Sequence, residues 1–368
     1  MGAFDSKIFN VEKTDYVNTS LFLGQDPGLF DTLNKRYPKI WKLYKSMKSL
    51  DWDENEFDYK SCNVEFKTCA RSVYDIMIKT LAWQWEADSV ASRTIAAVVP
   101  AFVSSSELWA AWQRVSDNEV VHAATYSEIV KMSFDNPEET LAEILSVTES
   151  LQRLSSVANI MARAYEVSHK LALGLIDKDS DEAYDAILLF TVAMLVLERI
   201  QFMASFAVTF AIADTGMFVP IGKAVQKIAQ DELEVHVELD KAILENELKT
   251  ARGAASFIRC RQQIQELIDE VLYSEFNWVD YLFSEGRELV GLNADLLKKW
   301  VAFCARDVYQ FLDLKAPMPL PTKLPLMYMG NWLNIGKTQP SPQEEDVGQY
   351  RVGVMRRNDE DAKFDVDF

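Results

Sequence analysis

The chain has 368 residues, 49% of them hydrophobic, and a formal net charge of −18 at pH 7, so its length allows one large domain or two ordinary ones. A negative charge of this size would repel the phosphate backbone of nucleic acids, which argues against a DNA- or RNA-binding function. We identify no apolar run long enough to span a membrane and no secretory signal, and the four cysteines lack C-x-x-C spacing, so we expect a soluble cytoplasmic protein with reduced thiols.

Seven segments carry apolar residues at the three- and four-residue spacing that is typical of amphipathic helices. In chain order they lie near residues 66–99, 104–132, 138–177, 182–213, 218–248, 253–288 and 292–314. Pro100, Pro137 and the sequence DTGMFVP at 214–220 separate some of these segments. No alternating pattern typical of β-strands and no internal repeat stands out. The sequence therefore predicts an all-α protein.

The C-terminal part of the chain has a different composition. Residues 316–342 are rich in Pro, Gly and Asn, and we expect them to cross the surface without regular structure. Residues 343–368 are highly charged and lack a helical pattern, which predicts a flexible tail. We therefore predict one helical domain over residues 1–342, including an N-terminal extension, followed by a tail over residues 343–368.

Four of the predicted helices each carry a carboxylate among apolar residues. Glu198 is the clearest case, because TVAMLVL lies before it and FMASFAVTFAIA after it, which leaves no polar face. A buried carboxylate needs a charged partner or a metal ion. The complete set consists of Asp88, Glu119 followed by His122, Glu198, and Glu232 followed by His236.

The six residues together indicate a metal site more strongly than any one of them does alone. A single carboxylate on a helix usually lies on a solvated face, and a lone Glu/His pair at this spacing is a common coincidence. Residues three or four apart on a helix lie on the same side, however, and such a pair can reach one ion. Four carboxylates and two imidazoles match the ligand set of di-iron and di-manganese four-helix bundles, with one Asp here in place of a Glu. These oxygen and nitrogen donors suit iron or manganese better than zinc.

With these motifs, the chain resembles the small, radical-generating β subunit of class I ribonucleotide reductase, a ferritin-like family. The resemblance covers most of the chain, through SLFLGQDPGLFDTLNKRYPKIWKLYKSM, WDENEFD, ADSVASR, EVVHAATY, LERIQFMASF, KIAQDE and the tail. It implies a ferritin-like helical bundle with a di-metal carboxylate site in the core. Iron is the expected metal, with manganese or mixed manganese and iron as alternatives. Glu119 and Glu232 would bridge the two ions.

The resemblance also implies a role for a tyrosine beside the metal site. Tyr126 lies one helical turn beyond His122 and would carry a neutral tyrosyl radical. A radical needs a dry, unreactive pocket, and the matching positions are Phe202, Phe206 and Ile228. Without the ligand pattern, Tyr126 is better interpreted as a core tyrosine with a hydrogen-bonded hydroxyl.

Three further residues match the family's radical-transfer relay. Asp231 would hydrogen-bond to His122 and link it to Trp52, and Tyr350 in the tail would pass the oxidising equivalent to a partner. The implied partner is the large (α) subunit, which binds the tail and reduces ribonucleotides to deoxyribonucleotides. Family members are also homodimers. His169, outside these motifs, is expected to be structural or exposed.

One stretch departs from the family pattern D-E-x-x-H. This chain has DELEVH at 231–236, with one extra residue before the histidine. Glu232 and His236 could bind at four-residue spacing, or a π-bulge could absorb the extra residue. A third option makes Glu234 the ligand. We favour Glu232, because Ile228 and Asp231 keep their family positions and residues two apart point in different directions.

Two other functions compete with this interpretation. One is a self-contained ferritin-like di-metal oxidase or monooxygenase that acts on its own substrate. The other is a ferritin-like metal store or an inert helical scaffold. Tyr126, Trp52 and the tail residue Tyr350 favour the reductase subunit, because neither alternative needs a radical relay to a partner.

Overall fold

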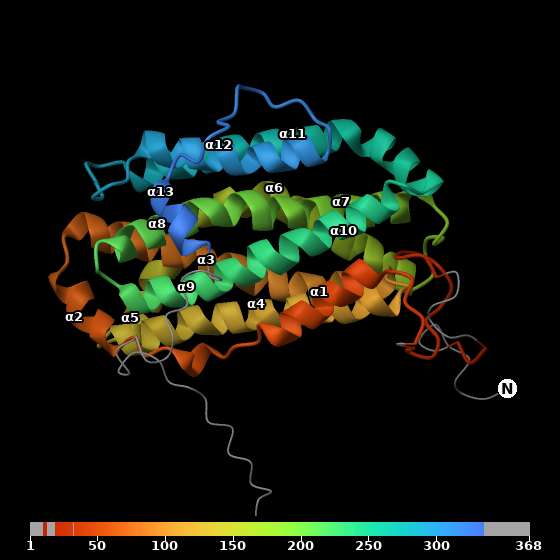
Figure 1. The fold of residues 1–368 in the computed structure, drawn as a ribbon, viewed down its shortest axis with the longest axis horizontal. Coiled ribbons are helices and arrows are strands. Elements are labelled where there is room, and N and C mark those ends of the chain that lie inside the picture. The colour runs from red at the N-terminus through yellow and green to blue at the C-terminus, as the bar shows by residue number, and fades with distance from the viewer. Residues whose placement is uncertain (1–9, 13–18, 32, 335–368) are drawn as a thin grey trace, which may run out of the picture.

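The structure is a computed structural model that describes residues 10–12, 19–31 and 33–334 (Figure 1). In this part of the chain there are helices and two isolated β-bridges, but no strand. The long helices run roughly along the long axis of the molecule, with α11 and α12 forming one outer layer and α1 and α4 lying on the opposite side. The predicted all-α fold is confirmed.

The helices of the described residues divide into those of 11 residues or more and those of nine or fewer. The longer ones are α1 (Pro38–Ser49), α3 (Arg71–Val98), α4 (Ser106–Ser133), α6 (Thr148–Ala172), α7 (Asp181–Val196), α8 (Phe202–Asp214), α9 (Val219–Asp231), α10 (Val237–Glu247), α11 (Ala251–Leu282) and α12 (Ala294–Phe311). The shorter ones are α2 (Lys60–Thr68), α5 (Pro137–Leu145) and α13 (Met327–Trp332), with 3₁₀ turns at Glu54–Glu56 and Val99–Ala101.

Polar side chains mark where several of these helices begin. The hydroxyls of Ser105, Ser180 and Thr250 accept hydrogen bonds from backbone N–H groups in the first turns of α4, α7 and α11. The side chain of Asn293 does the same for α12. The first N–H groups of a helix have no partner within it, so these caps satisfy them and fix the starting residue.

Two π-helical turns interrupt otherwise continuous helices. The turn η3 (Leu197–Gln201) joins α7 to α8, and η4 (Glu232–His236) joins α9 to α10. Each contains a backbone hydrogen bond between residues five apart in the sequence. In η3 the N–H of Phe202 donates to the carbonyl of Leu197, and in η4 the N–H of Val237 donates to the carbonyl of Glu232. Such turns are rare in proteins overall, but those that occur often lie at functional sites.

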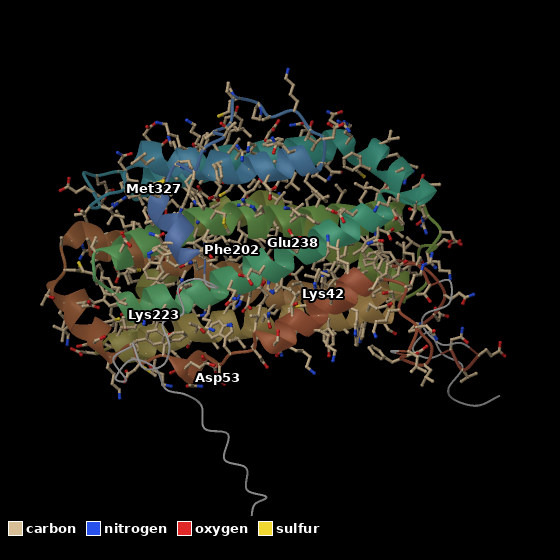
Figure 2. The ribbon with its side chains drawn as sticks, viewed as in Figure 1. Lys42, Asp53, Phe202, Lys223, Glu238 and Met327 are labelled. Carbon is tan, nitrogen blue, oxygen red and sulfur yellow. The ribbon has the colours of Figure 1, made fainter. Side chains whose placement is uncertain are left out.

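The helix Asp181–Asp214, formed by α7, η3 and α8, is the centre of the bundle. It is long and apolar enough to cross a membrane, so the expectation that no segment reaches this length was wrong. However, 94% of its most apolar window is buried inside the protein, as expected for a core helix. Figure 2 shows side chains filling the space between the helices, and the labelled Phe202 of α8 lies in this interior.

Several predicted boundaries differ from the structure. The segment 138–177 forms two helices, α5 and α6, because the chain turns at Ser146 and Val147. Residues 316–342 were expected to lack regular structure, but α13 forms within them. It is held against the bundle by Tyr328, whose hydroxyl donates to the carbonyl of Ala207 at 2.9 Å, and by Trp332, which stacks on Phe210 at 4.9 Å. The predicted tail, 343–368, lies outside the described residues.

Candidate metal centre

The six predicted ligands come together in the core from four helical segments. Asp88 comes from α3, Glu119 and His122 from α4, Glu198 from η3, and Glu232 and His236 from η4. These segments surround the centre because α3 packs against α4 and α8, and η3 packs against η4. All six side chains are buried, with at most 2% of any residue exposed.

The ligand atoms fall into two groups that share two carboxylates. Asp88, Glu119, His122 and Glu232 form one group, and Glu119, Glu198, Glu232 and His236 form the other. Within each group the ligand atoms lie within 4.8 Å of one another. The arrangement thus offers two neighbouring cation sites, with Glu119 and Glu232 in common.

The hydrogen bonding of this cluster fits a pair of bound cations. Both carboxylate oxygens of Asp88, Glu119 and Glu198 lack a hydrogen-bond partner among the described residues, as do one oxygen of Glu232 and Nδ1 of His122. A buried polar atom without a partner is costly, and native proteins rarely leave such atoms together. Metal ions would satisfy all of them at once, so the residues present fit a di-metal carboxylate site.

Without a cation, burial and neighbouring charges favour proton binding by several groups of the cluster. Burial raises the pKa of Asp88 well above its usual value, and the charge of Glu119 raises it further. Burial and the charges of Glu232 and Glu119 do the same to the pKa of Glu198. Burial lowers the pKa of His236, but Glu232 and Glu119 outweigh it and bring that pKa to about 10. Metal ions must therefore displace protons when they bind.

His122 connects the cluster to Trp52. Its Nδ1 lies 3.1 Å from a Glu232 oxygen, and its Nε2 lies 3.2 Å from Oδ2 of Asp231. Trp52 Nε1 donates to the same Asp231 oxygen at 2.7 Å, and the Trp52 ring stacks on His122 with centroids 5.9 Å apart. An imidazole ligand held by a carboxylate on its far side is common in metal sites. Trp52 is 8% exposed, so this chain of contacts leads towards the surface.

Of the three alternatives for the extra residue in DELEVH at 231–236, the structure contains the π-helical turn. The turn η4 spans the extra residue and directs Glu232 and His236 into the same group, with Nδ1 of His236 2.8 Å from Oε2 of Glu232. Glu234 is exposed and accepts a hydrogen bond from Gln230 at 3.3 Å. Glu234 therefore lies away from the centre.

Tyr126 is fully buried on α4 beyond His122. Its hydroxyl has no hydrogen-bond partner among the described residues, contrary to the interpretation as a core tyrosine with a bonded hydroxyl. Phe202, Phe206 and Ile228 are fully buried as well. Burial raises the pKa of Tyr126 well above its usual value, and the charges of Asp88, Glu232 and Glu119 raise it further. The phenol is therefore neutral at pH 7.

Two polar residues near the cluster, Asn118 and Asp240, were not predicted from the sequence. Nδ2 of Asn118 lies 3.4 Å from Nε2 of His236, but an Asn on a helix carries no signal that distinguishes it from a surface residue. Asp240 lies one turn beyond His236 and is 3% exposed. Burial raises its pKa well above the usual value. The stretch ELDKAIL around it includes Glu238 and Lys241, so Asp240 lacked the apolar surroundings that distinguished Glu198.

The remaining predicted positions lie elsewhere. His169 is exposed on α6, next to the ring of Tyr165. All four cysteines are free, as expected. Tyr350 lies outside the described residues.

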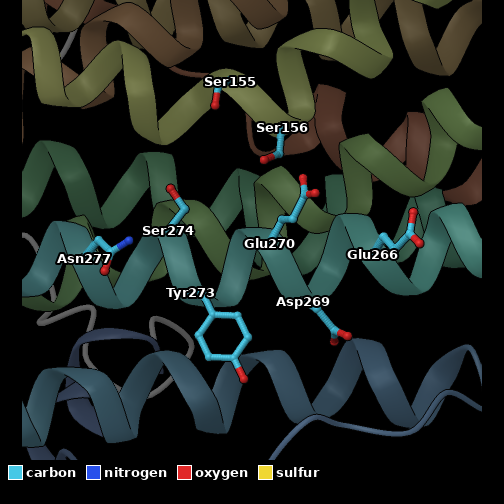
Figure 3. A pocket seen from close by; sticks show the side chains of 8 residues that line it. All are labelled: Ser155, Ser156, Glu266, Asp269, Glu270, Tyr273, Ser274 and Asn277. Carbon is cyan, nitrogen blue, oxygen red and sulfur yellow. The ribbon is translucent and has the colours of Figure 1, made fainter.

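Two surface cavities are also away from the centre. One, of about 440 Å³, lies between α6 and α11 and is lined by polar residues such as Ser155, Glu270 and Asn277 (Figure 3). The other, of about 350 Å³, includes Gly24, Phe102 and Lys178. None of the six ligands lines either cavity. A substrate pocket of a self-contained oxidase would have to open onto the metals, so neither cavity supports that alternative.

Comparisons with known proteins agree with this geometry. Residues 29–319 match the family model described as "Ribonucleotide reductase, small chain". Ribonucleoside-diphosphate reductase subunit beta of Buchnera aphidicola (subspecies Schizaphis graminum) is 25% identical over 97% of each chain. Ribonucleoside-diphosphate reductase 1 subunit beta of Escherichia coli O157:H7 is 24% identical over 98% of this chain and 97% of its own.

Solved structures show a similar fold. The ribonucleotide reductase R2 subunit from Clostridium botulinum aligns with a TM-score of 0.77 at 18% identity, over 89% of this chain and 97% of its own. The dimanganese(II)-NrdF of Streptococcus sanguinis aligns with a TM-score of 0.66 at 13% identity, over 83% of this chain and 98% of its own.

Proposed function

Because the chain belongs to the ribonucleotide reductase small-chain family, we propose that it generates a tyrosyl radical on Tyr126 and passes the oxidising equivalent to a large subunit. The large subunit then reduces ribonucleoside diphosphates to deoxyribonucleotides. The observation that carries this proposal is the buried pair of ligand groups, sharing Glu119 and Glu232, with the unpartnered hydroxyl of Tyr126 nearby on the helix of Glu119 and His122.

The proposed ligands are the six residues of the two groups, with Glu119 and Glu232 between the ions. Iron is our first candidate for both positions, with manganese or a mixed pair as the alternatives, since all suit oxygen and nitrogen donors. A bound metal pair of this kind, once oxidised by oxygen or peroxide, would accept the electron that Tyr126 loses in a one-electron step. Metal analysis of the purified protein distinguishes these compositions.

The chemistry of the phenol and of the predicted pocket residues supports the proposed role of Tyr126. Because the phenol is neutral, its oxidation removes both an electron and the hydroxyl proton and leaves a neutral phenoxyl radical. Phe202, Phe206 and Ile228, the predicted pocket residues, are fully buried, and the rings of Phe202 and Phe206 stack with centroids 5.6 Å apart. Next to Tyr126, such apolar side chains would exclude water and would offer no easily abstracted hydrogen from a thiol or hydroxyl. This surrounding would let the radical persist.

The contacts of Trp52 support a relay role. The hydrogen-bonded series His122, Asp231 and Trp52 joins the centre to a residue near the surface through bonds of 3.2 and 2.7 Å. Electrons would pass along this series, with Asp231 holding the indole N–H. Tyr350, in the tail that would dock on the large subunit, is the proposed next carrier. We also propose that two copies of the chain form a homodimer and that the protein acts in the cytoplasm.

The test is electron paramagnetic resonance of protein loaded with Fe(II) and exposed to oxygen or peroxide. We expect a tyrosyl radical signal in the wild type and none in Tyr126→Phe. Tyr59→Phe is a matched control, because Tyr59 is also fully buried with an unpartnered hydroxyl, and this variant should keep the signal. An unchanged signal in Tyr126→Phe would remove Tyr126 from the role.

A further inference from the structure

We propose that Arg153 is a positioning residue that holds the π-helical turn η3 and thereby sets the direction of Glu198. This inference rests on the proposed di-metal function. Arg153 lies on α6 and is 1% exposed. It is not among the centre's ligands, and the sequence analysis did not single it out.

The charge of Arg153 is balanced inside the protein. Its guanidinium forms a two-pronged ion pair with Glu275 of α11, with Nε and Nη2 at 2.5 and 2.6 Å from the two carboxylate oxygens. It also lies over the rings of Trp83 and Trp278, at 3.7 and 4.9 Å from their centroids. These contacts fix the guanidinium plane rigidly between α3, α6 and α11.

The same guanidinium donates to the π-helical segment. Nη2 donates to the carbonyl of Gln201, the last residue of η3, and Nη1 donates to the hydroxyl of Ser205 at 3.1 Å. In return, Nε2 of Gln201 donates to the backbone carbonyl of Arg153 at 2.8 Å. The end of the turn is therefore tied to α6 in both directions, three residues after Glu198.

This connection matters because Glu198 has little else to orient it. Its carboxyl interacts with that of Glu232 but has no hydrogen-bond partner outside the cluster among the described residues, so the backbone of η3 sets its direction. If the π-helical turn moved along the helix by one residue, a side chain within it would rotate by about 100°. An anchor at Gln201 opposes that movement.

A purely stabilising role explains these contacts less well. A buried ion pair is often no more stabilising than apolar residues of similar volume. An apolar pair at these positions would fill the space, but it could not donate to the Gln201 carbonyl or to Ser205. Arg153 forms no hydrogen bond or ion pair with any of the six proposed ligands or with Tyr126 among the described residues. Its proposed effect on the metal centre therefore acts through the π-helical turn η3.

The test is a titration of metal-free protein with Mn(II) alone, in which binding is monitored by electron paramagnetic resonance. The double variant Arg153→Met/Glu275→Met removes the anchor without leaving an unpaired buried charge. We expect the group that contains Glu198 to lose about 10- to 100-fold in Mn(II) affinity, a range typical of residues that orient ligands, while the group that contains Asp88 changes little. The signal of two coupled ions should then appear only at higher Mn(II), after that of a single ion.

Arg287→Met is the matched control. Arg287 is also an arginine with little exposure that donates to backbone carbonyls, those of Leu282 and Tyr281, but it follows the end of α11 and its hydrogen bonds stay within residues 281–285. This variant should bind both ions as the wild type does. If the double variant fails to fold, Arg153→Lys serves instead, because lysine keeps the charge for Glu275 but lacks the planar fork.

Each outcome separates the inference from the proposed function. Two Mn(II) ions bound with wild-type affinity in a folded Arg153 variant overturn the positioning role. Equal weakening of both sites also overturns it, because that pattern indicates general loosening of the bundle. If the wild type itself binds no pair of ions, the proposed di-metal function fails, independently of Arg153.

Discussion

Asp88→Leu should stabilise the metal-free protein, although it removes a proposed ligand. Both oxygens of Asp88 are buried and have no hydrogen-bond partner among the described residues. Leucine has the same branching at Cγ as aspartate but no polar atoms. The substitution therefore removes an unsatisfied polar group from the core, and it introduces a better helix former within α3.

The size of the effect follows from these two terms. An unsatisfied buried polar group costs about 1–3 kcal/mol, and the better helix propensity of leucine adds about 0.5 kcal/mol. At about 2.1 cal/mol/K per residue, unfolding of the 368-residue chain has an entropy of about 0.8 kcal/mol/K. The two terms together are about 1.5–3.5 kcal/mol, so the metal-free melting temperature should rise by about 2–4 °C.

The assay is thermal unfolding by circular dichroism, first with a chelator and then with Mn(II). Wild-type protein should gain stability from Mn(II), by about 2.7 kcal/mol per site at a hundredfold excess over Kd, and Asp88→Leu should lose roughly half of that gain. Asp75→Leu is the control on the same helix, since Asp75 forms an ion pair with Arg71 near the surface. A lower metal-free melting temperature in Asp88→Leu, with Asp75→Leu unchanged, would show that the Asp88 carboxyl is already satisfied and refute the reasoning.

Three other outcomes are expected. Glu232→Ala should abolish binding of both metal ions, because both groups share Glu232, whereas Glu234→Ala should keep two ions per chain by metal analysis; loss of metal in the second variant would reverse the assignment. Trp52→Phe removes the 2.7 Å hydrogen bond to Asp231 but none of the proposed ligands. The variant should therefore retain two metal ions per chain, and its rate of nucleotide reduction with the large subunit should fall about 100-fold or more. Tyr350→Phe should leave the radical signal intact and abolish turnover, and full turnover would exclude Tyr350 from the relay.

The ligand cluster could be predicted because its signals are local. Glu198 is identified by the apolar residues on either side, and the spacing of Glu119 and His122 becomes informative once it is combined with the carboxylates of the other helices. The structure brings these residues together with Asp88, Glu232 and His236, which is what the ferritin-like pattern implied. The order of the long helices followed from the same periodicity.

What sequence patterns missed depends on contacts between distant residues. Arg153, in TESLQRLSSV, has the pattern of a solvated helix face, and its burial depends on Glu275, 122 residues away. The helix α13 is six residues long and needs α8 to hold it, so its own sequence carries no sufficient signal. The π-helical turn at 232–236 was one of three alternatives, because a single extra residue does not show how a helix absorbs it.

The burial of the six proposed ligands would set how fast the centre exchanges metal ions. With no ligand more than 2% exposed, an ion enters or leaves only while the helices around the centre open transiently. Loading is then limited by the frequency of these openings rather than by diffusion, and so is release. A chelator added to the loaded protein should therefore strip it at a rate independent of chelator concentration, and ions once enclosed should have long residence times.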